Sequence, residues 1–175
     1  MNKAIALTCG LTAAVSFSTT PVTAQTSTNV VDSKSDWSVF VENEPLRCWI
    51  VSKPTKTVNT KGGKTVAVKR GEIRLFVTYL PKTGVKGEVS FTGGYPFKPD
   101  SPVILAIGAS EYKMYPDGEY AWPESSATDD KIRASMKRGA SAVVKAQSAR
   151  GTKTSDKFSL VGFTAALAEA EKRCK

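Results

Sequence analysis

Pairs of carboxylates are the residues whose type and spacing best suit acid–base chemistry in this sequence. Two carboxyl groups held close together can serve as acid and base, as they do in glycoside hydrolysis. The close pairs are Asp129–Asp130, Glu42–Glu44 and Glu169–Glu171. Each pair also has an ordinary interpretation, as a helix start, a loop and a solvated helix face. A small carboxylate-dependent hydrolase or glycan-processing enzyme is therefore an alternative function, not the first.

The chain has no histidine. Without histidine there is no Ser-His or Cys-His nucleophile pair and no imidazole ligand for a metal. We therefore expect neither catalytic residues nor a metal or other cofactor. We therefore expect first that this protein is not an enzyme.

Two partial resemblances to known catalytic motifs do not hold, because the order of the motifs or the spacing of their residues differs. Ser110–Lys113, Ser155–Lys157 and Lys82–Gly84 resemble the three motifs of penicillin-binding enzymes, but the Lys-Thr-Gly comes first here and a lysine replaces the asparagine of the middle motif. Gly62–Thr65 resembles the end of a phosphate-binding loop, but the glycine that the pattern needs earlier is Val58. We interpret the latter segment as a basic hairpin loop.

The positive charge offers a different kind of chemistry, because basic surfaces attract anionic lipids, acidic glycans or nucleic acid. Two stretches hold local clusters: Lys61, Lys64, Lys69 and Arg70, and then Lys131, Arg133, Lys137 and Arg138. Plain solubility explains such charge equally well. For an exported chain we expect an anionic lipid or glycan, or another envelope or host component, as the partner, and no nucleic acid.

The segment Gly93–Phe97 (Gly-Gly-Tyr-Pro-Phe) combines flexible glycines with two rigid aromatic residues. Tyr95 and Phe97 could form an exposed recognition loop, since aromatic side chains give contact area at little entropic cost. The commoner alternative is a loop that folds back over one end of the core.

The first residues indicate export. Lys3 is followed by an apolar stretch over residues 4–17 and by the small residues Val22–Ala24, which is the pattern of a secretory signal peptide. We predict a signal peptide at 1–24, a flexible leader at 25–35 and a single domain at 36–175, without a transmembrane segment after cleavage. The formal net charge of +9 then becomes +8, because Lys3 is lost. The threonine before Cys9 argues against a lipoprotein.

Two cysteines remain after cleavage, Cys48 and Cys174. An even number of cysteines in an exported chain predicts a disulfide, and two cysteines allow only one pairing. The alternative, two buried free thiols, fits an oxidising compartment poorly.

The elements that must position these residues are mostly strands. Short β-branched and aromatic runs alternate with turn signals, of which Pro116–Gly118 predicts a hairpin. Such spacing predicts a sandwich or barrel. Two helices are expected, one capped by Asp129 or Asp130 and stopped by Gly139, and one over 163–173 with an inward face that includes Cys174. Strands are predicted at 37–41, 48–51, 74–80, 88–92, 103–107, 112–115, 120–122, 142–147 and 157–160.

Several stretches of the chain, in one order, resemble the invasion-associated locus B family of bacterial envelope proteins. They are Cys48-Trp49, Gly93–Phe97, Met114–Trp122, Ile132–Gly139, Ser148–Thr152 and Asp156–Phe163 running on to Cys174. The resemblance implies an immunoglobulin-like β-sandwich, export to the periplasm or outer envelope, and no established enzymatic activity.

Overall fold

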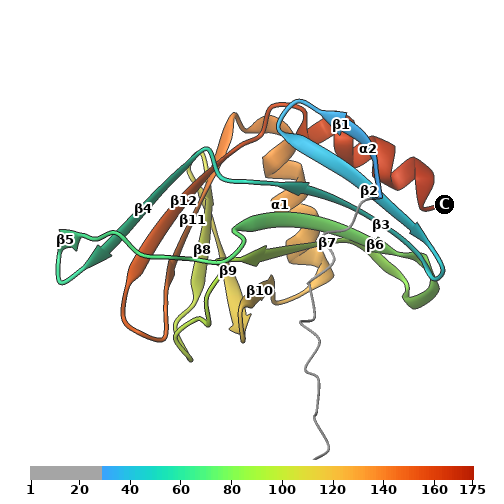
Figure 1. Cartoon of the computed structure of the whole chain (residues 1–175). Coiled ribbons are helices and arrows are strands. Elements are labelled where there is room, and N and C mark those ends of the chain that lie inside the picture. Colours follow the sequence, from blue (N-terminus) through green and yellow to red (C-terminus); the bar gives the residue numbers. More distant parts are fainter. Residues whose placement is uncertain (1–28) are drawn as a thin grey trace, which may run out of the picture.

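The computed structural model describes residues 29–175. The expected signal peptide at 1–24 and residues 25–28 of the expected leader lie outside this range. The described part is built mainly of antiparallel strands with two α-helices, one of them C-terminal, as the sequence predicted (Figure 1).

Twelve strands occur in the described part, with the bounds Val30–Lys34 (β1), Trp37–Asn43 (β2), Leu46–Ser52 (β3), Lys56–Lys61 (β4), Lys64–Thr65 (β5), Arg74–Leu80 (β6), Val85–Thr92 (β7), Val103–Ile107 (β8), Ser110–Asp117 (β9), Tyr120–Pro123 (β10), Ser141–Gln147 (β11) and Lys153–Ser159 (β12). The helices are α1 (Ser126–Arg138) and α2 (Phe163–Arg173), with a short 3-10 turn at Pro81–Thr83.

All these strands belong to one continuous sheet in the order β1-β2-β3-β6-β7-β10-β9-β8-β11-β12-β4-β5. The sheet folds over, so that strands distant in this order face each other across the core (Figure 1). The ring of Phe91 on β7 meets that of Phe158 on β12 with centroids 6.1 Å apart. The Trp37 indole on β2 donates to the Ser159 carbonyl at 3.1 Å. The two layers are thus halves of a single sheet.

The two helices close the core. α2 packs on β1, β2 and β3 and buries Phe163, Ala166, Leu167 and Ala170 on one face, as the spacing predicted. α1 lies against β7, β10 and β9 through Ile132 and Met136 (Figure 1).

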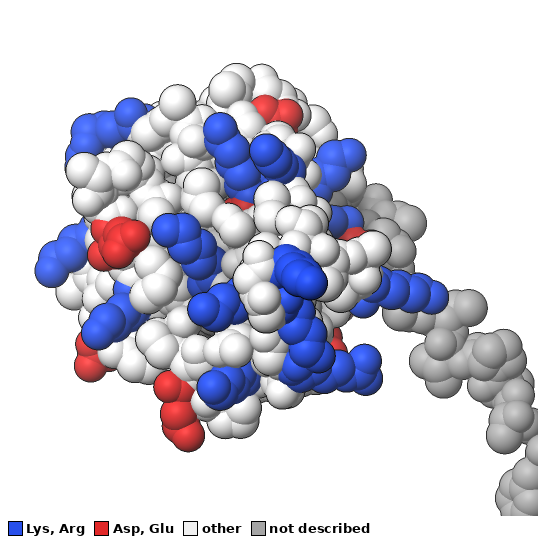
Figure 2. Space-filling view, turned by 90° about the vertical axis from the view of Figure 1, so that its left-hand side faces the viewer, with Lys and Arg blue, Asp and Glu red and all other residues white. Residues whose placement is uncertain are grey.

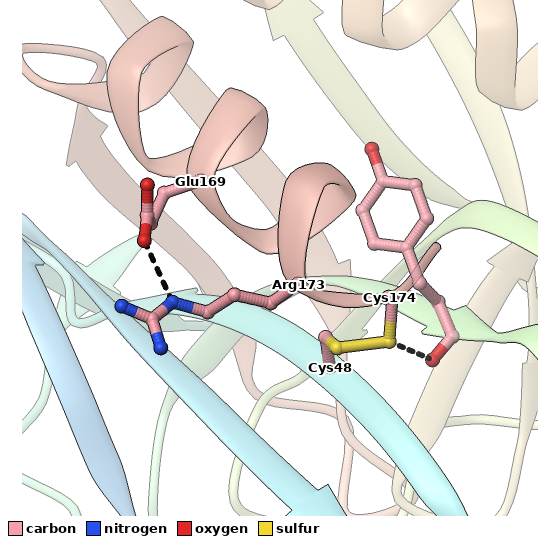
Figure 3. Close-up of a disulfide and its surroundings, with 5 residues drawn as sticks. Cys48, Glu169, Arg173 and Cys174 are labelled. Carbon is pink, nitrogen blue, oxygen red and sulfur yellow. Dashed lines mark hydrogen bonds and ion pairs between the residues drawn. A yellow bond between two sulfur atoms is a disulfide. The ribbon is translucent and has the colours of Figure 1, made fainter.

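The predicted disulfide joins Cys48 on β3 to Cys174 at the end of α2 (Figure 3). It ties residues 126 positions apart, with the Cα atoms separated by 5.8 Å. Nearby, Arg173 pairs with Glu169 at 2.7 Å, the expected pair one helical turn apart. The C-terminal helix is therefore fixed covalently to the strands whose inner face it covers.

Three elements differ from the sequence prediction. Residues 30–34 of the expected flexible leader form β1, because their backbone completes a hairpin with β2 although their side chains are mostly polar. β4 and β5 were not predicted, since they lack an alternating apolar face. α1 starts earlier than expected and is capped by Ser125, not by Asp129 or Asp130.

Gly139 does end α1, but its backbone is extended and not left-handed. A Cβ at this position would lie 2.7 Å from Ile107 Cγ2 and 3.0 Å from Leu160 Cδ1. The glycine therefore allows close packing between the helix end and the sheet.

Candidate functional site

A cleft of about 800 Å³ lies between α1 and the first half of β7. Several carboxylates line it, among them Glu88, Asp129, Asp130 and Glu171. This is the place where paired-carboxylate chemistry would have to occur, and it includes one of the pairs that the sequence suggested.

Asp129 is bound to the edge of β7. A bulge at Gly87 interrupts the pairing of β7 with β6, and residues 85–90 of β7 have no β10 partner. Asp129 accepts a hydrogen bond from the Val89 backbone N–H at 2.8 Å. Arg133, one turn later on α1, donates to the Gly87 carbonyl and pairs with Asp130. The two side chains satisfy backbone groups that a neighbouring strand would otherwise bind.

Burial perturbs the pKa values of two groups in this cleft, Asp129 and Tyr79. Burial raises the pKa of Asp129 to about 6, against the hydrogen bond from Val89 and the charge of Arg133, which lower it. Burial also raises the pKa of Tyr79 to about 12, so its phenol stays protonated at neutral pH. Acid–base catalysis by two carboxyls needs their pKa values held apart at the reacting bond, and the Asp129 carboxyl is engaged by the Val89 backbone N–H.

The other predicted carboxylate pairs are separated by their surroundings. Glu42 pairs with Arg47 across β2 and β3 at 2.6 Å. Glu169 faces Arg173 on α2, while Glu171 points to the cleft. Neither pair converges on a common hollow.

Arg70 does not belong to an exposed basic cluster. Its side chain is 7% exposed and forms two hydrogen bonds to the fully buried Asp156, at 2.6 and 2.8 Å. It also donates to the Gly93 carbonyl and to Asn59, and its guanidinium lies 4.9 Å from the Tyr95 ring centre. The sequence prediction of Arg70 as a contact residue is therefore wrong: β12, β4 and the 93–97 loop enclose it.

The 93–97 loop folds back over the core, as the commoner alternative had it. Phe97 is only 5% exposed and packs against Phe91, and the Tyr95 hydroxyl hydrogen-bonds to Thr154 at 2.5 Å. Burial raises the pKa of Tyr95. The loop is a structural cover for this end of the sheet, and Phe97 is not available as an interaction residue.

The remaining predicted basic residues lie in separate places. Lys61 and Lys64 face each other at the tip of the β4–β5 hairpin, whose turn is Gly62–Gly63, and Lys69 lies exposed on the following segment. Lys131, Lys137 and Arg138 are exposed on α1, whereas Arg133 is held by Gly87 and Asp130. The structure therefore does not bring the two predicted clusters together.

A larger basic surface, which we call the lysine face, lies on the outer side of β4, β12, β11, β8 and β9. Strand register places its outward positions side by side in three rows. These positions are Lys56, Val58 and Thr60; Lys157, Ser155 and Lys153; Val143, Lys145 and Gln147; Ala106 and Ile104; and Glu111 and Lys113. Five are lysines and one is a carboxylate, Glu111. Figure 2 shows this side of the molecule, where blue side chains predominate over red ones.

The five lysines of the lysine face are exposed, and none of them forms an ion pair within residues 29–175. The arginines Arg47, Arg70, Arg74, Arg133 and Arg173 all pair with carboxylates. The charge of the lysine face is therefore left for solvent or a ligand.

Sequence reasoning missed these lysines because they are spread over four strands, β4, β12, β11 and β9. The signal that could have found them is the alternation Lys153-Ser155-Lys157, with buried Thr154, Asp156 and Phe158 between. Only the second half of this strand was predicted, so the alternation went unused.

The other half of the sheet carries a different outer surface, which we call the aromatic face. Its members lie on β2, β3, β6, β10 and β9: Phe40, Trp49, Phe76, Tyr120, Trp122 and Tyr115. Phe40 stacks on Trp49 and Tyr120 stacks on Trp122, at 5.1 and 5.7 Å between ring centres. The Arg47 guanidinium lies 5.0 Å from the Trp49 ring centre.

Two further observations concern ions and membranes. Within the part of the chain that the structure describes, no three of the residue types His, Cys, Asp and Glu come together as a metal site. No helix in residues 29–175 has the length and apolar character needed to span a bilayer.

Comparisons with known proteins agree with the resemblance read from the sequence. Residues 115–171 match the family model of the Invasion associated locus B (IalB) protein. The fold is similar to the crystal structure of invasion associated protein B from Bartonella henselae, with a TM-score of 0.54 and 15% sequence identity. That match covers 79% of this chain and 94% of the other, and at such low identity it concerns the fold alone. No curated protein matches the chain significantly.

Proposed function

Since the chain carries the invasion-associated locus B signature over residues 115–171, we propose that it is an exported, non-enzymatic protein that binds an anionic component of the cell envelope or of a host surface. The binding surface is the lysine face. The name of the family and of its structural relative, which refers to invasion, agrees with a role at a cell surface.

The observation that carries this proposal is the set of unpaired lysines on one flat side of the sheet. A fixed array of like charges attracts an extended anion at long range and steers its approach. It also repels itself in the folded chain, and an anionic partner would relieve that repulsion. The shared chemistry of such partners is an array of phosphate or carboxylate groups.

Export is supported by two features of different origin. The first 24 residues have the pattern of a signal peptide. The disulfide between Cys48 and Cys174 fits an oxidising compartment such as the periplasm.

The alternative of a carboxylate-dependent hydrolase has weaker support. The cleft beside α1 offers one carboxyl group with a raised pKa, Asp129, and that group is bound to Val89 on β7.

The test is co-sedimentation with vesicles that contain an anionic phospholipid, run beside binding to an acidic polysaccharide. In the test variant Lys56, Lys145, Lys153 and Lys157 become Gln. We expect vesicle affinity to fall about a hundredfold or more, since each lysine near an anionic membrane contributes roughly 1 kcal/mol.

The matched control removes four charges elsewhere, with Lys131, Lys137, Arg138 and Lys172 changed to Gln. These residues are exposed on α1 and α2, and the control should keep most of the affinity. Equal losses in both variants would refute a localised binding surface. Failure of the wild type to bind either anionic probe would refute the proposed function.

A further inference from the structure

A groove of about 370 Å³ crosses the lysine face. It is lined from β4 by Val58 and Thr60, from β12 by Lys153 and Ser155, and from β11 by Lys145, with Ile104, Pro102 and Ser101 at the β8 end. No carboxylate is among the residues that line it. The groove is therefore a hollowed part of this surface whose charged lining residues are two lysines, Lys145 and Lys153.

The register of β11 and β12 places two lysines, Lys145 and Lys153, next to each other in the groove. Lys145 lies opposite Ser155, and Lys153 lies opposite Gln147, so the two lysines are diagonal neighbours on the same face. Diagonal neighbours of an antiparallel pair are about 7–8 Å apart at their Cα atoms. Two long ammonium side chains at this separation can both reach a single anion between them, with the Ser155 hydroxyl beneath it.

Apolar residues lie at both ends of the groove floor. Half-buried Val58 is at the β4 end, and half-buried Ile104 with exposed Pro102 is at the β8 end. Ser155 and Lys145 lie between them. An inorganic ion would leave this surface uncovered, whereas a ligand with a carbon skeleton next to its anionic group would cover it. The lining thus suits an amphiphile with a charged head.

We propose that this groove is a binding site for a phosphate ester with an apolar substituent. Lys145 and Lys153 bind the phosphate, which accepts charge-assisted hydrogen bonds from both ammonium groups. Ile104, the strand partner of Lys145, and Pro102 beside it contact the substituent. This inference rests on the proposed function and names the ligand class of the same surface.

The experiment separates the groove from the general charge of the surface. The groove variant is Lys145→Gln with Lys153→Gln, and the matched control is Lys56→Gln with Lys157→Gln, which removes the same charge from the same face outside the groove lining. All four lysines are exposed, so both variants should fold normally, which thermal unfolding checks.

The probes are short-chain phosphatidic acid below its micelle concentration, inorganic phosphate, and vesicles that contain phosphatidic acid, with binding followed by calorimetry or NMR. We expect the groove variant to lose about tenfold or more of the affinity for short-chain phosphatidic acid, because charge-assisted hydrogen bonds are lost. The control should lose less than about threefold, because its lysines do not contact the ligand. Both variants should bind vesicles more weakly, since all four lysines face an anionic membrane.

Three results would overturn the inference. If both variants lost the same affinity for short-chain phosphatidic acid, the ligand would be attracted by the general charge of the surface and not by the groove. The proposed function would then still stand. Wild-type binding to vesicles without binding to the short-chain lipid would have the same meaning. If inorganic phosphate bound as tightly as the lipid, the apolar residues of the groove would contribute nothing to the affinity. Absence of wild-type binding to both the anionic vesicles and the acidic polysaccharide would instead overturn the proposed function itself.

Discussion

The two halves of the sheet share one core but differ on their outer surfaces. Outward positions on β4, β12 and β11 include four lysines, and within residues 29–175 none of these makes an ion pair. Outward positions on β2, β3 and β6 hold Phe40, Trp49 and Phe76, and the charges there are paired, as Arg47 is with Glu42. The first surface leaves its charge available, and the second satisfies its groups internally.

The difference shows that the inward and outward side chains of a strand meet separate requirements. Inward positions must be apolar to build the core, whereas outward positions are free of that requirement. On the aromatic face they add stability, since cross-strand aromatic pairs contribute roughly 0.2–1 kcal/mol each. On the lysine face the outward lysines form no ion pair within residues 29–175, so this is the face on which the proposed binding function rests.

The largest stability effect is expected beneath the lysine face. Changing Arg70 to Met leaves Asp156 buried without its cation, which costs about 3–5 kcal/mol. The free energy of unfolding from urea titration measures this. The double variant Arg70→Met with Asp156→Leu should recover part of the loss, and a single variant as stable as the wild type would contradict the enclosed ion pair.

Beneath the aromatic face, the corresponding constraint is covalent. Cys48→Ser should lower the free energy of unfolding by about 2–5 kcal/mol, because the disulfide closes a loop of more than 100 residues. Chemical denaturation of the variant, and of the wild type with reductant, should give matching midpoints. Labelling of both cysteines by an alkylating reagent in the native protein without reductant would rule out the bridge.

Where the halves join, α1 makes the stability depend on pH. The folded chain raises the pKa of Asp129 from 3.8 to about 6, so the native state binds the proton more tightly than the unfolded state does. The stabilisation by this group is complete below about pH 4 and is lost as the pH rises through about 6. The effect amounts to at most about 3 kcal/mol.

The variant Asp129→Asn keeps an acceptor for Val89 but cannot titrate, so it should lack this loss of stability between pH 4 and 6. Denaturation midpoints of wild type and variant, compared across this range, measure the difference. If the denaturation midpoints of the two proteins changed with pH in the same way, the pKa of Asp129 would not be raised in the folded protein.

The smallest of these effects is expected on the aromatic face itself. Trp49→Ala removes the stacking on Phe40 and the contact with Arg47, which should cost about 1–2 kcal/mol. Vesicle binding should stay within about twofold of wild type, because no lysine-face residue is changed. Lys157→Ala should do the reverse, with stability changed by less than about 0.5 kcal/mol and binding weakened. Loss of vesicle binding in Trp49→Ala would erase the distinction between the faces.

The sequence predicted the parts of the fold that depend on local pattern. β6 and β8 have the predicted bounds, α2 buries the predicted face, and the cysteines pair as expected. Alternation and helical spacing are written in consecutive residues and so are visible in one sequence.

The site could not be predicted because it depends on contacts between distant residues. Arg70 and Asp156 are 86 residues apart, and Asp129 lies 40 residues from its partner Val89. The lysine face forms only when register places β4 beside β12 and β12 beside β11. Clusters of basic residues that are neighbours in the sequence, such as those around Lys64 and Lys137, can be recognised without the fold, and their role in binding stays a prediction.

The measurement that tests the account most directly is the salt dependence of vesicle binding for wild type, the lysine-face variant (Lys56, Lys145, Lys153 and Lys157 to Gln) and Trp49→Ala. At low salt we expect wild type and Trp49→Ala to bind anionic vesicles alike and the lysine-face variant to bind about a hundredfold more weakly or worse. At 1 M salt, where screening acts within about 3 Å, the three proteins should bind equally poorly. Wild-type binding that persists at high salt, or that Trp49→Ala loses and the lysine-face variant keeps, would contradict the account.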